Sequence, residues 1–231
     1  MSHKHEIEED NPFAMSTGDL MAALLFVFVL LLAAAMLQLN RTNAKIEEVS
    51  QEYEDTRKSI IIGLHDELTE EQLDDWGAEI IDSTLTIRFQ KDEAFFAGGR
   101  HDIPEDFKRT LDSFFPKYLE VLREYKDNIA EVRIEGHTSS EYGSAANPFI
   151  ENMKLSQDRS RSVFQYCESL TPDEDKEWVH ERVTANGLSS SHLILHPDGT
   201  ENKEKSRRVE FRIMPTSEAS LKNIRDILNN N

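Results

Sequence analysis

The chain has 231 residues, with 44 acidic residues against 26 basic ones and a formal net charge of −18. Because phosphate binding needs clustered lysine and arginine, this charge argues against direct binding of nucleic acid. The single cysteine, Cys167, excludes an intrachain disulfide bond. Of the scattered histidines only His192 and His196 are four apart, and Pro197 follows directly, so we expect them on a loop and not in a metal site. We predict one folded domain beside a membrane anchor, with no metal site and no cofactor.

The first predicted element is a transmembrane helix over residues 16–39. Its centre, residues 20–37, contains no charge and no proline, and a run of that length is typical of a membrane span. At about 1.5 Å per residue the helix is about 36 Å long, enough to cross a bilayer with some tilt. Ser16 or Thr17 is placed to accept a hydrogen bond from a free backbone N–H at the helix start. Residues 1–15 form a predicted tail before this helix.

Asp19 lies at the edge of this helix, one residue before the apolar run. A carboxylate at that depth is costly unless it binds a cation, takes up a proton or finds a partner. The alternative is an aspartate at a helix start, which favours the positive end of the helix dipole and contacts headgroup water. The residue alone does not decide between these two interpretations.

Two features of the N-terminal region bear on targeting and orientation. The alanines at 33–35 resemble a signal-peptide cleavage site, but the segment before the apolar run carries Lys4 against four acidic residues. Signal peptides begin basic and have a shorter apolar stretch, so we predict a retained anchor. Arg41 and Lys45 follow the helix and by themselves weakly favour an external N-terminus.

An amphipathic helix is predicted to continue the membrane helix through a linker at 40–77. Its apolar positions recur with a spacing of three and four residues, in phase with Leu39. Such a seam predicts a parallel dimer through a short coiled coil, and the alternative is a single helix packed on the following domain. Residues 63–77 form an acidic connector. The seam positions are Leu39, Ile46, Val49, Tyr53, Thr56 and Ile60.

Residues 78–215 alternate between strand and helix patterns, and residues 216–231 form a C-terminal tail. This order predicts an α/β sandwich whose helices cover one side of a sheet. The predicted strands span 80–89, 129–135, 179–185 and 208–213, and the predicted helices span 104–125 and 155–170.

Four short segments of this domain form a pattern when they are taken together. They are Ile-Glu-Gly-His-Thr at 134–138, Asn-Met-Lys-Leu-Ser-Gln-Asp-Arg-Ser at 152–160, Ala-Asn-Gly at 185–187 and Arg-Arg-Val-Glu-Phe at 207–211. Their order and spacing resemble the OmpA-like peptidoglycan-binding domain, over roughly residues 80–215. In that family the domain grips the diaminopimelate-bearing stem peptide of the cell wall. The resemblance therefore implies a periplasmic location for this domain and a cytoplasmic N-terminus.

The resemblance also implies which residues bind peptidoglycan. Arg159, near a predicted helix start, offers a planar fork for a ligand carboxylate, which free N–H groups would reinforce. Asn152 orients the loop or binds the peptide, and Leu155 forms an apolar wall. The alternative for Arg159 is a surface arginine paired with Asp158 or Glu151. The implied site comprises His137, Thr138, Ser139, Asn152, Leu155, Arg159 and Arg207.

Two positions depart from the family pattern. The family's aspartate after Gly-His-Thr is Ser139 here, and its asparagine before Arg-Arg-Val-Glu is Ser206. The usual anionic partner for the ligand's amino group is therefore missing, and Glu141 is the substitute that the sequence offers. These changes bear on diaminopimelate specificity more than on wall binding.

The whole arrangement resembles the B subunit of flagellar stators (MotB). The segment Ser-Thr-Gly-Asp-Leu-Met at 16–21 is similar to that family's motif, in which the aspartate carries the translocated ion. The acidic tail and the absence of tryptophan at 11–15 bring the chain closer to the B subunits of the Zorya anti-phage defence system (ZorB). This resemblance implies an inner-membrane protein whose partner is an A subunit (ZorA), five copies around two of this chain. Asp19 would carry the ion, a proton in preference to sodium, with help from Thr17.

Two other functions stay open from the sequence: a flagellar stator subunit, and a purely structural OmpA-like wall anchor. The first differs in its partner, and the second needs no aspartate within the membrane. We find no nucleophile and base, and no paired acids, at a recognisable spacing, so we predict that the chain is not an enzyme.

Overall fold

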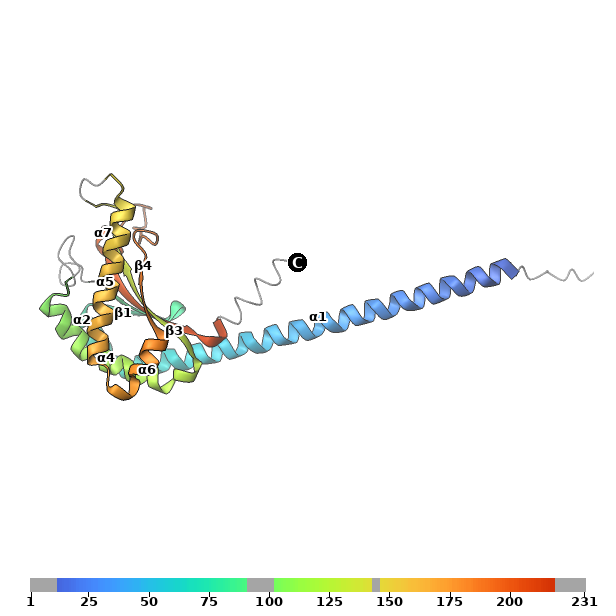
Figure 1. The fold of residues 1–231 in the computed structure, drawn as a ribbon, viewed down its shortest axis with the longest axis horizontal. Coiled ribbons are helices and arrows are strands. Elements are labelled where there is room, and N and C mark those ends of the chain that lie inside the picture. The colour runs from blue at the N-terminus through green and yellow to red at the C-terminus, as the bar shows by residue number, and fades with distance from the viewer. Residues whose placement is uncertain (1–11, 91–101, 143–145, 219–231) are drawn as a thin grey trace, which may run out of the picture. The chain divides into compact units, whose positions relative to one another are not determined.

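The computed structural model describes residues 12–90, 102–142 and 146–218 of the chain. Residues 1–11 and 219–231, which make up most of the two predicted tails, lie outside the described residues. The chain divides into two units, Met1–Glu48 and Val49–Asn231, and each is described by itself (Figure 1).

The long helix α1 spans Pro12–Glu67 and supplies all of the described structure of the first unit. It begins four residues before the predicted start at Ser16, because proline fits the first position of a helix, where its missing N–H is not needed. The predicted cap is therefore wrong: Ser16 and Thr17 lie inside α1 and not at its beginning.

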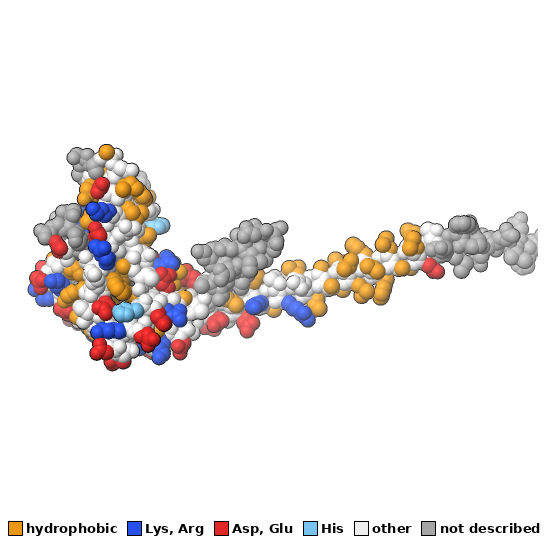
Figure 2. Space-filling view, in the orientation of Figure 1, with side chains coloured by type: hydrophobic (Ala, Val, Ile, Leu, Met, Phe, Trp, Pro, Cys, Tyr) orange, Lys and Arg blue, Asp and Glu red, His pale blue; other side chains and the backbone are white. Residues whose placement is uncertain are grey.

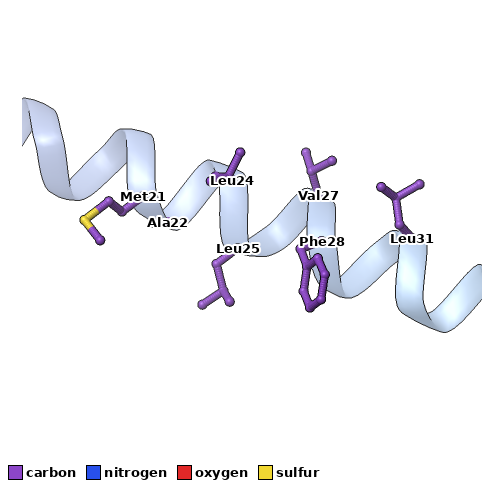
Figure 3. Close-up of a pocket in the computed structure, with 7 residues that line it drawn as sticks. All are labelled: Met21, Ala22, Leu24, Leu25, Val27, Phe28 and Leu31. Carbon is purple, nitrogen blue, oxygen red and sulfur yellow. The ribbon is translucent and has the colours of Figure 1, made fainter.

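The apolar side chains of α1 are exposed along the predicted membrane span. The exposed fractions of the large ones between Leu20 and Leu39 range from 49% to 74%. Figure 3 shows side chains such as Leu24, Leu25 and Phe28 projecting from different sides of the helix, and Figure 2 shows how continuous this apolar surface is. Among the described residues, α1 is the one helix long and apolar enough to cross a membrane, with a mean hydropathy of 3.0 in its most apolar window.

The end of α1 belongs to the core of the second unit. Ile60, Leu64 and Leu68 are at most 1% exposed. Ile60 is therefore wrong as a position of a dimer seam, because it is already buried by its own domain. The predicted connector at 63–77 contains the last turn of α1 and the short helix α2 (Glu70–Trp76).

The second unit contains one mixed five-stranded sheet with the order β1-β2-β5-β3-β4. Neighbouring strands are antiparallel except β3 and β4, which are parallel. The strands are β1 (Ala78–Ile81), β2 (Thr86–Phe89), β3 (Ile129–His137), β4 (Val183–Gly187) and β5 (Arg208–Pro215).

Two predicted strands differ from the observed ones. The single strand predicted over 80–89 is a hairpin, because the 3-10 turn η1 (Asp82–Thr84) and Leu85, with a φ of 49°, separate β1 from β2. The strand predicted from Val179 begins at Val183, because Val179 still lies in α6.

Helices α4 and α5 cover the face of the sheet that carries the apolar side chains (Figure 1). Phe114 of α4 contacts Phe89 of β2 and Phe211 of β5 with ring centroids 5.0 and 5.1 Å apart. The predicted α/β sandwich is thus confirmed. The remaining elements are α4 (Glu105–Glu124), η2 (Lys126–Asn128), α5 (Pro148–Leu170), α6 (Asp173–Arg182) and α7 (Lys203–Ser206).

Candidate functional site

The predicted motifs meet where β3 and β4 end against the middle of α5. Two glycines make this close approach possible. A Cβ atom at Gly136 would lie 2.5 Å from the carbonyl oxygen of Ser156, and one at Gly187 would lie 2.3 Å from the backbone nitrogen of Gln157. Real Cβ atoms essentially never approach that closely, so any other residue would push α5 away from the strand ends.

A frame of hydrogen bonds around Ser189 joins these elements. Its backbone N–H donates to Ser156 Oγ at 3.0 Å, and its hydroxyl donates to the carbonyl oxygen of Phe149 at 2.8 Å. Its carbonyl oxygen accepts from the Thr138 N–H at 3.0 Å. Sequence reasoning missed Ser189, and only its place two residues after Gly187 could have drawn attention to it.

Asn152 holds the loop that follows β3. Its side-chain amide donates to the carbonyl oxygens of Ser139 at 3.0 Å and Glu141 at 3.2 Å, and the residue is 2% exposed. Of its two predicted roles, orientation of the loop is therefore the one that the geometry supports.

The other predicted site residues divide by burial. His137, Thr138 and Ser139 are each 3% exposed and Arg159 is 5% exposed, whereas Leu155 and Arg207 are half-buried. Arg159 is therefore not the surface arginine of the alternative interpretation. Asp158, its suggested surface partner, pairs with Arg161 at 3.0 Å.

The helix start lies farther from Arg159 than the sequence predicted. Helix α5 begins at Pro148, where the Asn147 side chain accepts a hydrogen bond from the Ile150 N–H. Arg159 is the twelfth residue of the helix, about 16 Å along its axis at about 1.5 Å per residue. The free N–H groups at the helix start therefore do not act beside Arg159, and that part of the prediction is wrong.

Two carboxylates border the loop after β3. Glu141 is exposed and pairs with Lys203 at 2.7 Å, and this hydrogen bond lowers the pKa of Glu141 below its ordinary value. Glu201, which sequence reasoning did not select, accepts hydrogen bonds from the backbone N–H of Ser140, at 2.9 Å, and from its hydroxyl. The predicted substitute Glu141 thus already has a cationic partner.

The opposite face of the sheet is polar and carries a buried charge network beside the site. The Glu210 Oε1 atom of β5 accepts from Arg88 Nε and Arg208 Nε, both at 2.7 Å, and its Oε2 atom lies 3.4 Å from His137 Nε2. His137 Nε2 also lies 3.7 Å from Glu135 Oε2. Burial would raise the pKa of Glu210, but the neighbouring His137 ring and the Arg208 guanidinium hold it well below its usual range.

Comparison with known proteins identifies similar chains. The OmpA family matches residues 95–207. The Zorya protein ZorB of Escherichia coli (strain Crooks) is 38% identical over 221 residues, which cover 94% of each chain. A ZorB of Escherichia coli O139:H28 is 26% identical over 215 residues, which cover 89% of this chain and 81% of that protein. A solved MotB-like protein from Desulfovibrio vulgaris covers 73% of this chain and 94% of its own, with a TM-score of 0.48 and 20% identity.

Proposed function

Because this chain belongs to the ZorB family, we propose that it is the wall-anchored membrane subunit of a Zorya anti-phage defence system, built like a MotB stator subunit. The observation that carries the proposal is the 38% identity to a ZorB protein over 94% of the chain. The position of Asp19 in α1, directly before the exposed apolar segment, supports it.

The first unit is proposed to cross the inner membrane once. The large apolar side chains of α1 find no cover within their unit, and transfer of such surface out of water is favourable by about 25 cal/mol per Å². The N-terminus is then cytoplasmic and the second unit is periplasmic, because peptidoglycan lies on that side. Arg41 and Lys45 weakly favour the opposite orientation of the helix. The location of peptidoglycan in the periplasm outweighs this preference.

Asp19 is proposed to carry the translocated ion, with a proton preferred to sodium. It is the eighth residue of α1, two turns inside the helix, whereas the helix dipole acts on side chains of the first turn. Its side chain is exposed, and a Cβ atom at Gly18 would meet nothing within 4 Å. A partner helix therefore has room to approach, and Thr17, one residue before this glycine, is proposed to assist the ion.

The second unit is proposed to bind the stem peptide of peptidoglycan. Arg159 supplies the cation for a ligand carboxylate, and the loop held by Asn152 lies at the adjacent end of β3. The family's aspartate is replaced by Ser139, and Glu201 and Glu141 are the carboxylates that border the same loop. The site is therefore proposed to keep wall binding while its contact with the ligand's amino group differs from the family pattern.

The partners are proposed from the family. An A subunit (ZorA) surrounds the membrane helices, with five copies around two of this chain. Pairing of the two chains is proposed to use the seam without Ile60, which is buried within its own domain. The remaining seam positions are Leu39, Ile46, Val49, Tyr53 and Thr56. Ion flow past Asp19 would drive the A-subunit ring.

The test is Asp19→Asn in the complete defence system. This change keeps the size and polarity of the side chain and removes its charge and its ability to exchange a proton. We expect normal protein levels, normal assembly with the A subunit and normal wall binding, but loss of protection in a phage plating assay.

The matched control is Asp55→Asn on the same helix. Asp55 is exposed and accepts a hydrogen bond from Gln51 at 3.0 Å, outside the apolar segment. This variant should protect as well as the wild type. Full protection by Asp19→Asn at matched protein levels would remove the ion-carrying role and leave the chain a wall anchor.

A further inference from the structure

Three metal-binding side chains converge at one place on the polar face of the sheet. Glu135 and His137 of β3 and Glu210 of β5 are 6%, 3% and 7% exposed. Their nearest ligand atoms all lie within 4.8 Å of one another. Glu135 lies directly opposite Glu210 in the register of the two strands. His137 is two residues after Glu135 in β3, so its side chain is on the same face of the sheet.

The imidazole of His137 is the part of this cluster that lacks a hydrogen bond. Neither of its ring nitrogens makes a hydrogen bond to the described residues, although both are buried. A buried polar atom without a partner costs free energy, and buried polar groups in native proteins are generally satisfied. His137 Nε2 points at the two carboxylates from 3.4 and 3.7 Å, so an occupant between them would satisfy it.

The arginines around Glu210 leave one of its oxygens available. Both guanidinium groups contact Oε1, whereas Oε2 is the atom that faces His137. Ligating carboxylates are commonly held by such second hydrogen bonds. With His137 neutral, as a metal ligand must be, the carboxylates of Glu79, Glu135 and Glu210 outnumber the guanidinium groups of Arg88 and Arg208 by one. The network around a bound ion would then carry a net negative charge.

We propose that Glu135, His137 and Glu210 bind one divalent transition-metal ion, with Zn²⁺ the best match. Zinc takes imidazole nitrogen and carboxylate oxygen at about 2.0–2.2 Å, which places two tetrahedral ligand atoms about 3.4 Å apart. The observed separations of 3.4 and 3.7 Å are close to that value. This site revises the prediction from sequence of no metal, which considered spacing along the chain and not across strands.

His192, in the loop after β4, is a candidate for a fourth ligand. The ring of His192 lies 6.2 Å from that of His137, and His192 is exposed, while its carbonyl oxygen accepts from Arg208. Water or the His192 ring would complete the coordination of a bound ion. A bound ion would tie β3 to β5 directly below the loop at 138–141, so the site has a structural role.

The experiment uses the full-length protein in detergent, purified without a polyhistidine tag and freed of metal by a chelator. Titration with Zn²⁺ in a competing-chelator assay should give one equivalent per chain. The Glu135→Gln variant keeps the size of the side chain and leaves the Glu210 pairs with arginine intact. It should weaken zinc binding by at least about tenfold, and His137→Gln should do the same.

His180→Ala is the matched control, because His180 forms an exposed pair with Glu168 at 3.3 Å. It should bind zinc as the wild type does. X-ray absorption at the zinc edge gives a readout without any variant, and should show nitrogen and oxygen ligands with no sulfur. Absence of stoichiometric zinc in the wild type, or equal affinity in Glu135→Gln and His180→Ala, would overturn the proposal and leave the cluster an ion pair.

Discussion

Two phenylalanines show how differently the two units use the same chemistry. Phe28 in the apolar segment of α1 is 62% exposed, whereas Phe114 in α4 is 0% exposed. Phe114 contacts the rings of Trp76, Phe89, Tyr118 and Phe211, with centroids 5.0 to 5.7 Å apart. The second unit thus supplies its own apolar environment, and the first unit needs one from outside the chain.

This contrast teaches which part of the chain carries stability and which part carries association. A buried aromatic side chain contributes to folding through contacts that the chain itself provides. An exposed one in α1 contributes only when lipid or a partner helix covers it. Substitutions in the core of the second unit should therefore change the free energy of unfolding. Substitutions in the apolar segment of α1 should change assembly with lipid or a partner helix.

The largest expected effect comes from truncating the core side chain. Phe114→Ala should reduce the free energy of unfolding of the second unit by about 3–5 kcal/mol, because it removes buried surface and leaves a cavity. Phe28→Ala should leave that free energy unchanged. Denaturant unfolding of the chain in detergent, followed by tryptophan fluorescence of Trp76 and Trp178, measures both. Equal destabilisation by the two variants would contradict the division.

A smaller effect is expected at the wall-binding site. Arg159→Ala removes a charge-assisted contact worth about 1.5–3 kcal/mol, which lowers affinity for purified peptidoglycan roughly ten- to a hundredfold. Arg161→Ala on the same helix, where the side chain is 62% exposed, should bind like the wild type. A sedimentation assay with peptidoglycan compares them. If Arg159→Ala co-sediments as strongly as Arg161→Ala, the binding surface lies elsewhere.

Two glycine-to-alanine substitutions should differ in their effect on the free energy of unfolding by about 1–3 kcal/mol. Gly187→Ala forces a methyl group into the backbone of Gln157, and overpacking of this kind is destabilising by about that amount. Gly18→Ala meets nothing within 4 Å and replaces a poor helix former in α1, so unfolding of the second unit should not change. Thermal unfolding of both variants checks this, and a stable Gly187→Ala would mean that α5 can move away from the strand ends.

The smallest expected effect is a pH dependence from Glu210. Its pKa is lower in the folded chain than in the unfolded one, so its stabilisation is full above the ordinary glutamate value of about 4.3 and is lost as the pH falls below it. One proton gives a slope of at most about 1.4 kcal/mol per pH unit. Glu210→Gln should therefore be less stable at neutral pH and show a shallower acid loss. Parallel acid profiles for variant and wild type would contradict this.

The sequence predicts best where one physical pattern acts alone. The uncharged run at 20–37 predicts the exposed apolar part of α1, and the helical spacing of apolar residues at 104–125 predicts α4 almost to its ends. The short motifs predict which segments meet. Their glycines, Gly136 and Gly187, lie where the ends of β3 and β4 touch the backbone of α5.

The sequence predicts the structure poorly where one pattern fits two structures, or where the contact depends on the pairing of distant strands. The spacing that includes Ile60 fits a dimer seam and a domain core equally well, and only the fold shows that the core takes it. Leu85 adopts a positive φ that leucine rarely prefers, so nothing in its identity predicts the hairpin. Glu135 and Glu210 are 75 positions apart, and only the register of β3 with β5 brings them together.

The position of β5 sets the order in which this sheet can be completed. It is the last strand in the described part of the chain, yet it lies between β2 and β3 and joins the two halves of the sheet. A chain that emerges residue by residue, from a ribosome or an export channel, holds β2 and β3 without a common neighbour until residues 208–215 arrive. The Arg88–Glu210 pair closes a separation of 122 positions, and late closure of such loops slows folding. Any product that stops before Arg208 presents two open strand edges, so premature termination leaves an aggregation-prone fragment and not a smaller domain.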